Sequence, residues 1–171
     1  VMNSSIVLIF DLLSYFFVIL FVFNLFKVNY FNPIVKIFVN IYKPIAKINI
    51  FPSQLITIFL IALLIKFTGF YLSYSSSYDE MTLALVSLIK TISIIFRVMF
   101  FAIIGSVILS WVAPNNNHPL LALINEISSG VLDPVRKYIP AFGGLDFSPL
   151  FALILFNQLE ILLNSILRSI I

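Results

Sequence analysis

Five ionisable side chains interrupt the long apolar stretches of this 171-residue chain, and they are the first candidates for chemistry. An ionisable group near the centre of a membrane helix costs about 2.5–3.5 kcal/mol on insertion scales, so each one needs a reason. Two explanations are open: the charges neutralise one another and fix helix packing, or they form a polar path for ions or protons. The five residues are Asp11, Lys66, Lys90, Arg97 and Glu160.

A second candidate is the segment PAFGGLDFSP at 140–149, directly before the last apolar run. Its glycines permit positive φ and close chain approach, but no Lys or Ser/Thr follows in the spacing of a phosphate-binding loop. Ser148 before Pro149 has the form of a helix N-cap and a first-turn proline, and Asp146 suits the positive helix end. We predict a hinge at the start of a helix, with docking through the exposed backbone as the alternative. The hinge residues are Gly143, Gly144, Asp146, Ser148 and Pro149.

The chain has few of the residue types that other catalytic or metal sites require. The chain has no Cys and one histidine, His118, which excludes thiolate metal sites, cysteine nucleophiles and sites that need two histidines from this chain alone. No Ser/His/Asp set and no nucleic-acid motif can be assembled from the sequence. We therefore predict no enzymatic activity, no metal, no cofactor and no nucleic-acid partner, and we expect His118 to be a capping or surface residue.

The elements that must position these residues belong to a membrane protein. The composition is 61% hydrophobic and 10% charged, against about 25% charged in soluble domains. So much apolar surface cannot be buried inside a soluble domain of this size. Four stretches reach the ~20 residues that cross a bilayer, at 6–26, 53–72, 81–112 and 149–171. The predicted fold is an all-α integral membrane protein with four transmembrane helices.

Two connections between these spans have the pattern of amphipathic helices. In 33–48 the polar residues recur at spacings of four, three and four, which places them in one stripe on a helix. A similar polar stripe runs through 118–138. Each segment is predicted to lie in the membrane interface or to form a shallow re-entrant hairpin, with basic residues toward anionic headgroups. The basic residues concerned are Lys36, Lys43, Lys47, Arg136 and Lys137.

The same basic residues predict the orientation. The first and third connections carry Lys and Arg, whereas the second carries Asp79 and Glu80 and no base. By the positive-inside rule the first and third connections face the cytoplasm, so both termini face the periplasm of a bacterial inner membrane. Trp111 closes the third span on the cytoplasmic side, where it is expected to anchor the helix at the interface.

The two halves of the chain repeat one order of elements: span, x-Pro, amphipathic segment, span. Residues 1–78 form the first repeat and 79–171 the second, and Pro33 and Pro119 set an offset of 86 residues. Both repeats begin on the same side, which predicts a parallel duplication about an axis along the membrane normal. The elements are 6–26, 33–48 and 53–72, then 81–112, 118–138, the hinge 140–149 and 149–171.

The repeat gives the charged residues predicted partners. With the offset of 86, Asp11 maps onto Arg97; with an offset of 95, which relates the starts of the second spans, Lys66 maps within one residue of Glu160. Opposite charges at equivalent positions of two halves should face each other across the pseudo-twofold axis. We therefore predict Asp11–Arg97 and Lys66–Glu160 pairs, with Arg97–Glu160 as the competing pair.

The stretch SWVAPNNNHPLLALINEISSGVLDPVRKYIPAFGGLDFSPL resembles the YggT family of small bacterial membrane proteins, whose relatives include the YlmG proteins of cyanobacteria and plastids. The duplicated four-span layout is similar to that of proteobacterial members, although the first half lacks the basic pair and the glycine hinge. The resemblance implies roles in osmotic or ionic tolerance, in division-site and nucleoid organisation, or in cytochrome maturation. The matching motifs are Ser110-Trp111, His118-Pro119, Asp133-Pro134, Arg136-Lys137, Ile139-Pro140 and the run from Gly143 to Pro149.

Three functions are compatible with these features. The first is an inner-membrane scaffold or assembly factor that docks another membrane protein on its amphipathic segments and hinge. The second is an oligomeric channel or transporter component in osmotic or ion homeostasis, favoured by the intramembrane charges. The third is a membrane organiser that binds anionic lipid through its lysine stripe. The expected partners are the lipid bilayer and either another membrane protein or a second copy of the chain.

Overall fold

The computed structural model describes residues 2–46, 53–112, 118–139 and 146–171, with side chains described from residue 5 onward. Within these ranges the chain is helical and forms no strand. The helices are α1 (Met2–Leu25), α2 (Pro33–Ala46), α3 (Gln54–Tyr74), α4 (Glu80–Val112), α5 (Pro119–Arg136) and α6 (Ser148–Ile170). The prediction of an all-α fold is confirmed.

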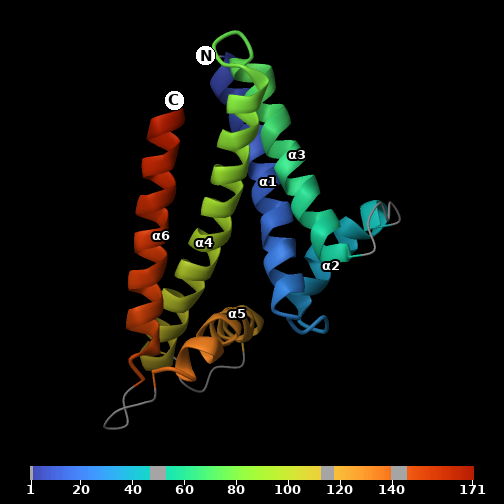
Figure 1. Ribbon diagram of the computed structural model, residues 1–171. Helices are drawn as coiled ribbons and strands as arrows, with labels where there is room; N and C mark the ends of the chain where they lie inside the picture. The colour runs from blue at the N-terminus through green and yellow to red at the C-terminus, as the bar shows by residue number, and fades with distance from the viewer. Residues whose placement is uncertain (1, 47–52, 113–117, 140–145) are drawn as a thin grey trace.

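Four of the helices, α1, α3, α4 and α6, are long and apolar enough to cross a membrane, as predicted. The chain is therefore a membrane protein. Figure 1 shows the two termini at one end of the bundle, while α2 and α5 lie toward the opposite end. At 33 residues α4 is about 50 Å long, so it must tilt or extend beyond a hydrocarbon core of about 30 Å.

The tightest packing lies between α1 and α3. Val18 and Val22 of α1 and Ala62 of α3 are fully buried, and the Ser14 hydroxyl of α1 donates to the Ala62 carbonyl at 3.2 Å. Near the other end of the pair, a Cβ at Gly69 would lie 2.5 Å from the Cβ of Phe10, so only glycine permits this approach of the two backbones. Small residues at such contacts let membrane helices pack closely without a hydrophobic driving force.

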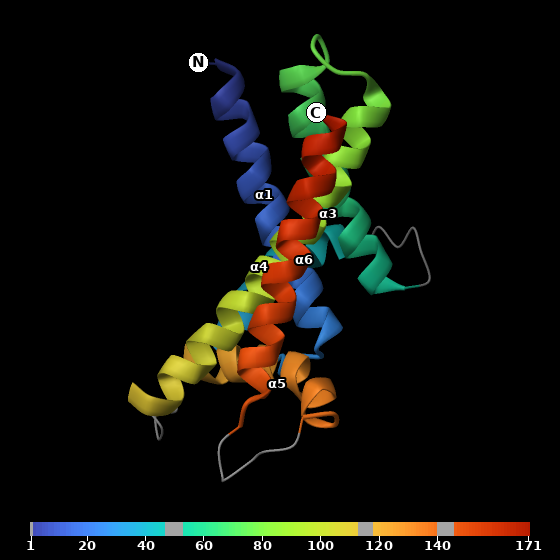
Figure 2. The same ribbon diagram turned by 60° about the vertical axis from the view of Figure 1, so that its left-hand side comes forward.

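Helix α4 is the central element of the bundle. It lies between α6 and the α1–α3 pair (Figure 1) and contacts α1, α3, α5 and α6. Its Ile103 is fully buried. Helix α6, by contrast, packs on α4 and α5. Only 17% of the most apolar stretch of α6 is buried, against 28–33% of the corresponding stretches of the other three spans. Figure 2 shows α6 in front of α4, with α1 diverging from it toward the N-terminus.

The two shorter helices start in the same way and are joined at their starts. Asn32 precedes α2, and its Oδ1 accepts the backbone N–H of Ile34 at 3.0 Å. His118 caps α5, where its Nδ1 accepts the backbone N–H of Leu120 at 3.2 Å, so the capping role expected for it is confirmed. The Asn32 amide donates to the carbonyl of Pro119 at 2.8 Å. This bond links the N-termini of α2 and α5.

The turn between α1 and α2 lies on α5. The Asn29 backbone N–H donates to Glu126 Oε2 at 2.7 Å, and Lys27 takes a positive φ of 50° within the turn. Gly130 of α5 faces the Phe26 ring, where any Cβ would overlap it. We call residues 26–46 and 118–139, which comprise this turn, α2 and α5, the α2–α5 layer. Its contacts hold the two halves of the chain together at one end of the bundle.

Candidate functional site

The first pair of intramembrane charges joins α1 to α3. Lys66 Nζ lies 2.6 Å from Asp11 Oδ1, and the Lys66 side chain is only 5% exposed. Its ammonium also lies 5.5 Å from the centre of the Phe70 ring, within range of a cation–π interaction. Since the lysine is enclosed by α1 and α3, its charge is balanced inside the protein.

The second pair joins α4 to α6 and is much more open. Arg97 Nη2 lies 2.9 Å from Glu160 Oε1, and the two side chains are 51% and 25% exposed. The Tyr15 side chain of α1 also interacts with Arg97. The guanidinium therefore lies between α1 and α6, on the surface of α4.

The pairs expected across the pseudo-twofold axis, Asp11–Arg97 and Lys66–Glu160, are wrong, and the competing pair Arg97–Glu160 is confirmed. Depth along the bundle explains the difference. The residue of α1 that reaches Arg97 is Tyr15, one helical turn beyond Asp11, whereas Lys66 of α3 lies level with Asp11. Each ion pair joins two spans from the same half of the chain.

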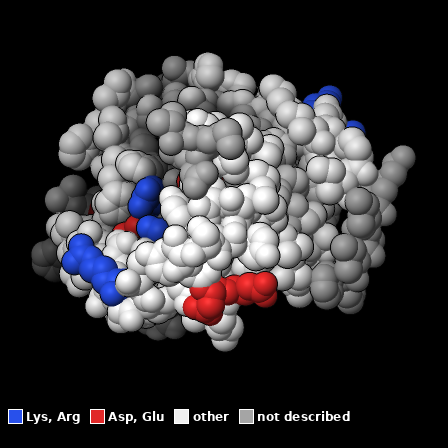
Figure 3. Space-filling view, turned by 90° about the horizontal axis from the view of Figure 1, so that it is seen from above, with Lys and Arg blue, Asp and Glu red and all other residues white. Residues whose placement is uncertain are grey.

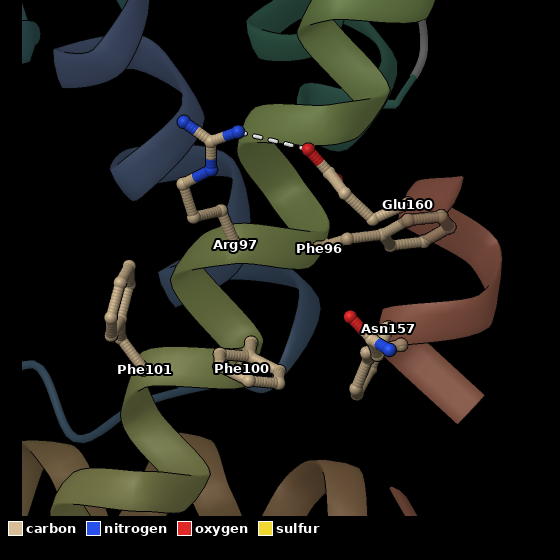
Figure 4. Close-up of a pocket in the computed structure, with 7 residues that line it drawn as sticks. Phe96, Arg97, Phe100, Phe101, Asn157 and Glu160 are labelled. Atoms are coloured by element: carbon tan, nitrogen blue, oxygen red, sulfur yellow. Dashed lines mark hydrogen bonds and ion pairs between the residues drawn. The ribbon is translucent and has the colours of Figure 1, made fainter. Parts of the chain in front are cut away.

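A cavity of about 170 Å³ surrounds the second pair, between α4 and α6 (Figure 4). Its walls are aromatic, with Asn157 and the ion pair as the polar groups. In Figure 4 Asn157 and Glu160 project from α6 toward α4, and Arg97 reaches across to the carboxylate. The lining residues are Phe96, Arg97, Phe100, Phe101, Phe156, Asn157 and Glu160.

Lys90 lies apart from both pairs, toward the end of the bundle that holds the termini. It lines a separate cavity of about 240 Å³ with Tyr74, Tyr78 and Thr82, close to the C-terminal Ile171. This position near the end of its span allows the lysine stem to extend along the helix toward the interface.

The predicted hinge is described only in part, because Gly143 and Gly144 lie outside the described residues. Asp146 Oδ2 lies 2.9 Å from Arg136 Nε, and Arg136 Nη1 lies 2.9 Å from Asp133 Oδ1. Asp146 Oδ1 accepts the Ser148 backbone N–H at 2.9 Å, as expected of a carboxylate at a positive helix end. The hydroxyl of Ser148 donates to the carbonyl of Ile139 at 3.2 Å. These bonds tie the start of α6 to the end of α5.

The prediction that Ser148 is the N-cap is wrong. Helix α6 begins at Ser148 itself, Phe147 precedes it, and Pro149 is the second helical residue. The capping acceptor is the Asp146 carboxylate, while the fully buried Ser148 hydroxyl faces Ile139. Ser148, the first residue of α6, therefore bonds to the end of the preceding segment at Ile139. The Asp146 carboxylate accepts the free N–H at the start of the helix.

The charges of this connection depend on one another. Burial acts to raise the pKa of Asp146, but hydrogen bonds from Ser148 and Arg136 outweigh it and hold that pKa below its usual value. Burial likewise opposes the charge of Arg136, and its bonds to Asp146 and Asp133 outweigh that effect and raise the Arg136 pKa. Both groups are therefore charged at neutral pH.

On α2 the lysines predicted to contact lipid headgroups, Lys36 and Lys43, are exposed, and Val35 and Tyr42 are buried. Burial raises the pKa of Tyr42 despite its hydrogen bond to Gln54 of α3. Lys47 lies outside the described residues. The corresponding residues at the end of α5, Arg136 and the following Lys137, are also exposed.

Exposed aromatic residues accompany these basic groups. Trp111, in the last turn of α4, is 82% exposed at the end of the bundle where α5 lies. Sequence reasoning missed Phe31 and Tyr138, each 86% exposed in the α2–α5 layer; their positions beside two basic, proline-bounded helices are the signal that could have found them. Seen from the opposite end, the described surface is mostly uncharged, with a few separated basic and acidic groups (Figure 3).

The described part of the chain thus defines a class of small helical membrane protein, with four candidate spans, two ion pairs between spans and a helical layer at one end. A family model described as CCB3/YggT matches residues 85–167. An uncharacterised protein of Pseudomonas aeruginosa is 33% identical over 152 residues, which cover 83% of this chain and 77% of that protein. The chain belongs to the CCB3/YggT family.

Other relatives agree with this assignment. An uncharacterised protein of Haemophilus influenzae is 34% identical over 145 residues, 77% of this chain and 76% of that protein. The protein YggT of Escherichia coli K12 is 28% identical over 85 residues, which cover 50% of this chain and 43% of YggT. No solved structure matches the chain.

Proposed function

We propose that the protein is a non-enzymatic scaffold or assembly factor of the bacterial inner membrane, which docks another membrane protein on the α2–α5 layer. The observation that carries the proposal is the set of large aromatic side chains exposed at this end. Phe31, Trp111 and Tyr138 are each more than 80% exposed, and the exposed basic residues Lys36, Lys43 and Arg136 belong to the same end. Aromatic residues dominate the binding energy of protein interfaces, and at the membrane surface they remain within reach of a partner.

Hydrogen bonds and an ion pair join the parts of the α2–α5 layer to one another and to the start of α6, which suits docking. The Asn32–Pro119 and Asn29–Glu126 bonds join its two helical parts, and the Asp146–Arg136 pair fixes the start of α6 below them. A preformed surface loses little conformational entropy when it binds. In this proposal the layer faces the cytoplasm, and both termini face the periplasm.

We further propose that residues 1–78 and 79–171 are two parallel repeats. Support comes from the matching proline starts of α2 and α5 and from one ion pair between the two spans of each half. The sign of the pair is reversed: the acid precedes the base in the first half, and the base precedes the acid in the second.

Site-specific photo-crosslinking in membranes tests the docking proposal. A photoreactive residue at Phe31 or Tyr138 should give one discrete heterologous product, whereas the same residue at Leu64, 61% exposed on α3, should not give it. The double substitution Phe31→Ala and Tyr138→Ala should remove that protein from the native complex. Equal products at all three positions, or only self-crosslinks, would contradict the proposal.

A second candidate is an oligomeric channel or transporter component, favoured by the half-exposed Arg97 in the middle of α4. Purified protein in liposomes should then conduct ions, and Arg97→Ala or Glu160→Ala should change the flux. The Phe31→Ala and Tyr138→Ala variant would leave such flux unchanged. The two candidates therefore differ in which variant loses function.

A further inference from the structure

We infer that a second copy of this chain docks on the α4–α6 face, where Arg97 and Glu160 of one copy pair reciprocally with Glu160 and Arg97 of the other. The α4–α6 face comprises Arg97 and Phe101 of α4 with Asn157 and Glu160 of α6. This surface is distinct from the α2–α5 layer and goes beyond the proposed docking function.

Arg97 is half exposed at the middle of a membrane span. Arg97 lies close to the middle of α4 and Glu160 close to the middle of α6, so the pair lies deep in the bilayer. With 51% of the Arg97 side chain exposed beyond its contacts with Glu160 and Tyr15, a single copy would present this charged side chain to hydrocarbon. Charged groups in membrane spans almost always face the interior of a bundle, as the basic member of the other pair does: Lys66 is 5% exposed, while its partner Asp11 is 33% exposed.

The part of α6 that neighbours Arg97 is also exposed. Asn157, one turn from Glu160 and on the same side of α6, is exposed. Helix α6 is the least buried of the four spans and packs on α4 and α5. Amide side chains on membrane helices form hydrogen bonds across helix contacts. A further helix on this face would cover the Asn157 amide and Arg97 together.

The charges of the face favour a second copy as that partner. Arg97 and Glu160 are in contact at 2.9 Å, so they lie at the same depth in the membrane. A twofold axis along the membrane normal preserves depth, and therefore brings each Arg97 level with the other copy's Glu160. A guanidinium offers five N–H donors and a carboxylate two acceptor oxygens, so each group can keep its internal partner and bind the second. The face is complementary to itself.

Photo-crosslinking tests this contact in the native membrane, because a photoreactive side chain reacts inside the hydrocarbon, where a cysteine thiol would stay protonated and unreactive. A photoreactive residue in place of Asn157 should form a covalent dimer. The same residue in place of Leu64, 61% exposed on α3, is the matched control and should remain monomeric. Equal yields, no dimer, or a product with a different protein would overturn the proposal.

A charge-exchange experiment tests the reciprocal pairs, because it compares each charge-reversed variant alone with the two variants expressed together. Arg97→Glu alone and Glu160→Arg alone should each lose self-association by about tenfold, because like charges then meet across the axis. Co-expressed with different tags, the two variants should associate with each other, since the acidic groups of one copy then face the basic groups of the other. Association in neither combination, or wild-type self-association in both single variants, would overturn the reciprocal pairing.

Discussion

Lys66 and Asp11 show how an ionisable residue is retained inside a membrane helix pair. The lysine side chain is 5% exposed and its ammonium has one carboxylate partner at 2.6 Å. Removing one member of a buried pair leaves an uncompensated charge, which costs more than the pair itself contributes. The pair is therefore better understood as neutralised together than as two separate polar groups.

We expect Asp11→Ala to destabilise the protein by about 3–5 kcal/mol, as for other buried pairs that lose one partner. The double variant Asp11→Ala and Lys66→Met should recover most of that loss, because no charge remains. Unfolding in detergent, followed by helical circular dichroism, measures both. A double variant as unstable as Asp11→Ala would show that the loss came from packing and not from the unpaired lysine.

Gly69 provides a test of backbone approach at the same helix contact. Gly69→Ala would place a Cβ against the Cβ of Phe10, which cannot rotate away, so α1 and α3 must separate at a cost of about 1–3 kcal/mol. Gly105→Ala is the matched control, since its nearest neighbour is the movable Ile124 side chain at 3.3 Å. Equal losses of thermal stability in the two variants would contradict this account.

At the scale of single residues the sequence identified the charges but not their partners. The repeat offset placed Asp11 opposite Arg97, yet Tyr15 holds that position because Asp11 lies one turn nearer the N-terminus. Pairing depends on the depth of each side chain, and depth follows from helix tilt and stagger. Sequence offsets alone contain neither quantity.

The Asp146 carboxylate stabilises the connection from α5 to α6 through its bonds to Arg136 and to the Ser148 N–H. Because the pKa of Asp146 is depressed in the folded protein, its contribution to stability is present above its unfolded pKa of about 3.9. That contribution is lost as pH falls through the lower folded value. We expect protection of the first turn of α6 against hydrogen exchange to fall on acidification, and to fall less in Asp146→Asn. An identical acid response in both proteins would exclude Asp146 as the cause.

Helix α2 carries Lys36 and Lys43, which we expect to bind anionic lipid headgroups. In lipid nanodiscs containing anionic lipid, Lys36→Gln with Lys43→Gln should retain fewer anionic lipids than the native protein, since each lysine near an anionic surface contributes about 1 kcal/mol. Asn40→Gln, on the same exposed stripe, is the uncharged control. Native mass spectrometry counts the retained lipids. Unchanged lipid retention would remove the headgroup role of this stripe.

At this scale the sequence predicted most of the helices, because an apolar run of about 20 residues and a polar stripe each have a defined period. It misplaced the start of α6 by assigning the cap to Ser148. The cap depends on which oxygen reaches the free N–H: Asp146 Oδ1 accepts it, while Arg136 binds Oδ2 of the same carboxylate. The sequence pattern alone did not distinguish the carboxylate at 146 from the hydroxyl at 148 as the acceptor.

The whole molecule has both termini at one end and the α2–α5 layer toward the other (Figure 1). We expect Tyr138→Cys in intact bacterial cells to be protected from a membrane-impermeant thiol reagent after the outer membrane is permeabilised, because residue 138 faces the cytoplasm in the proposed orientation. Tyr78→Cys, in the turn between α3 and α4, should react. Labelling of Tyr138→Cys with protection of Tyr78→Cys would reverse the proposed orientation.

The mass of the intact particle, released gently from the native membrane, tests the central claim most directly. The account predicts two copies of this chain together with a second membrane protein. In the Phe31→Ala and Tyr138→Ala variant the second protein should be lost while the two copies remain. A particle that contains this chain alone, in the native protein as in the variant, would contradict the scaffold function.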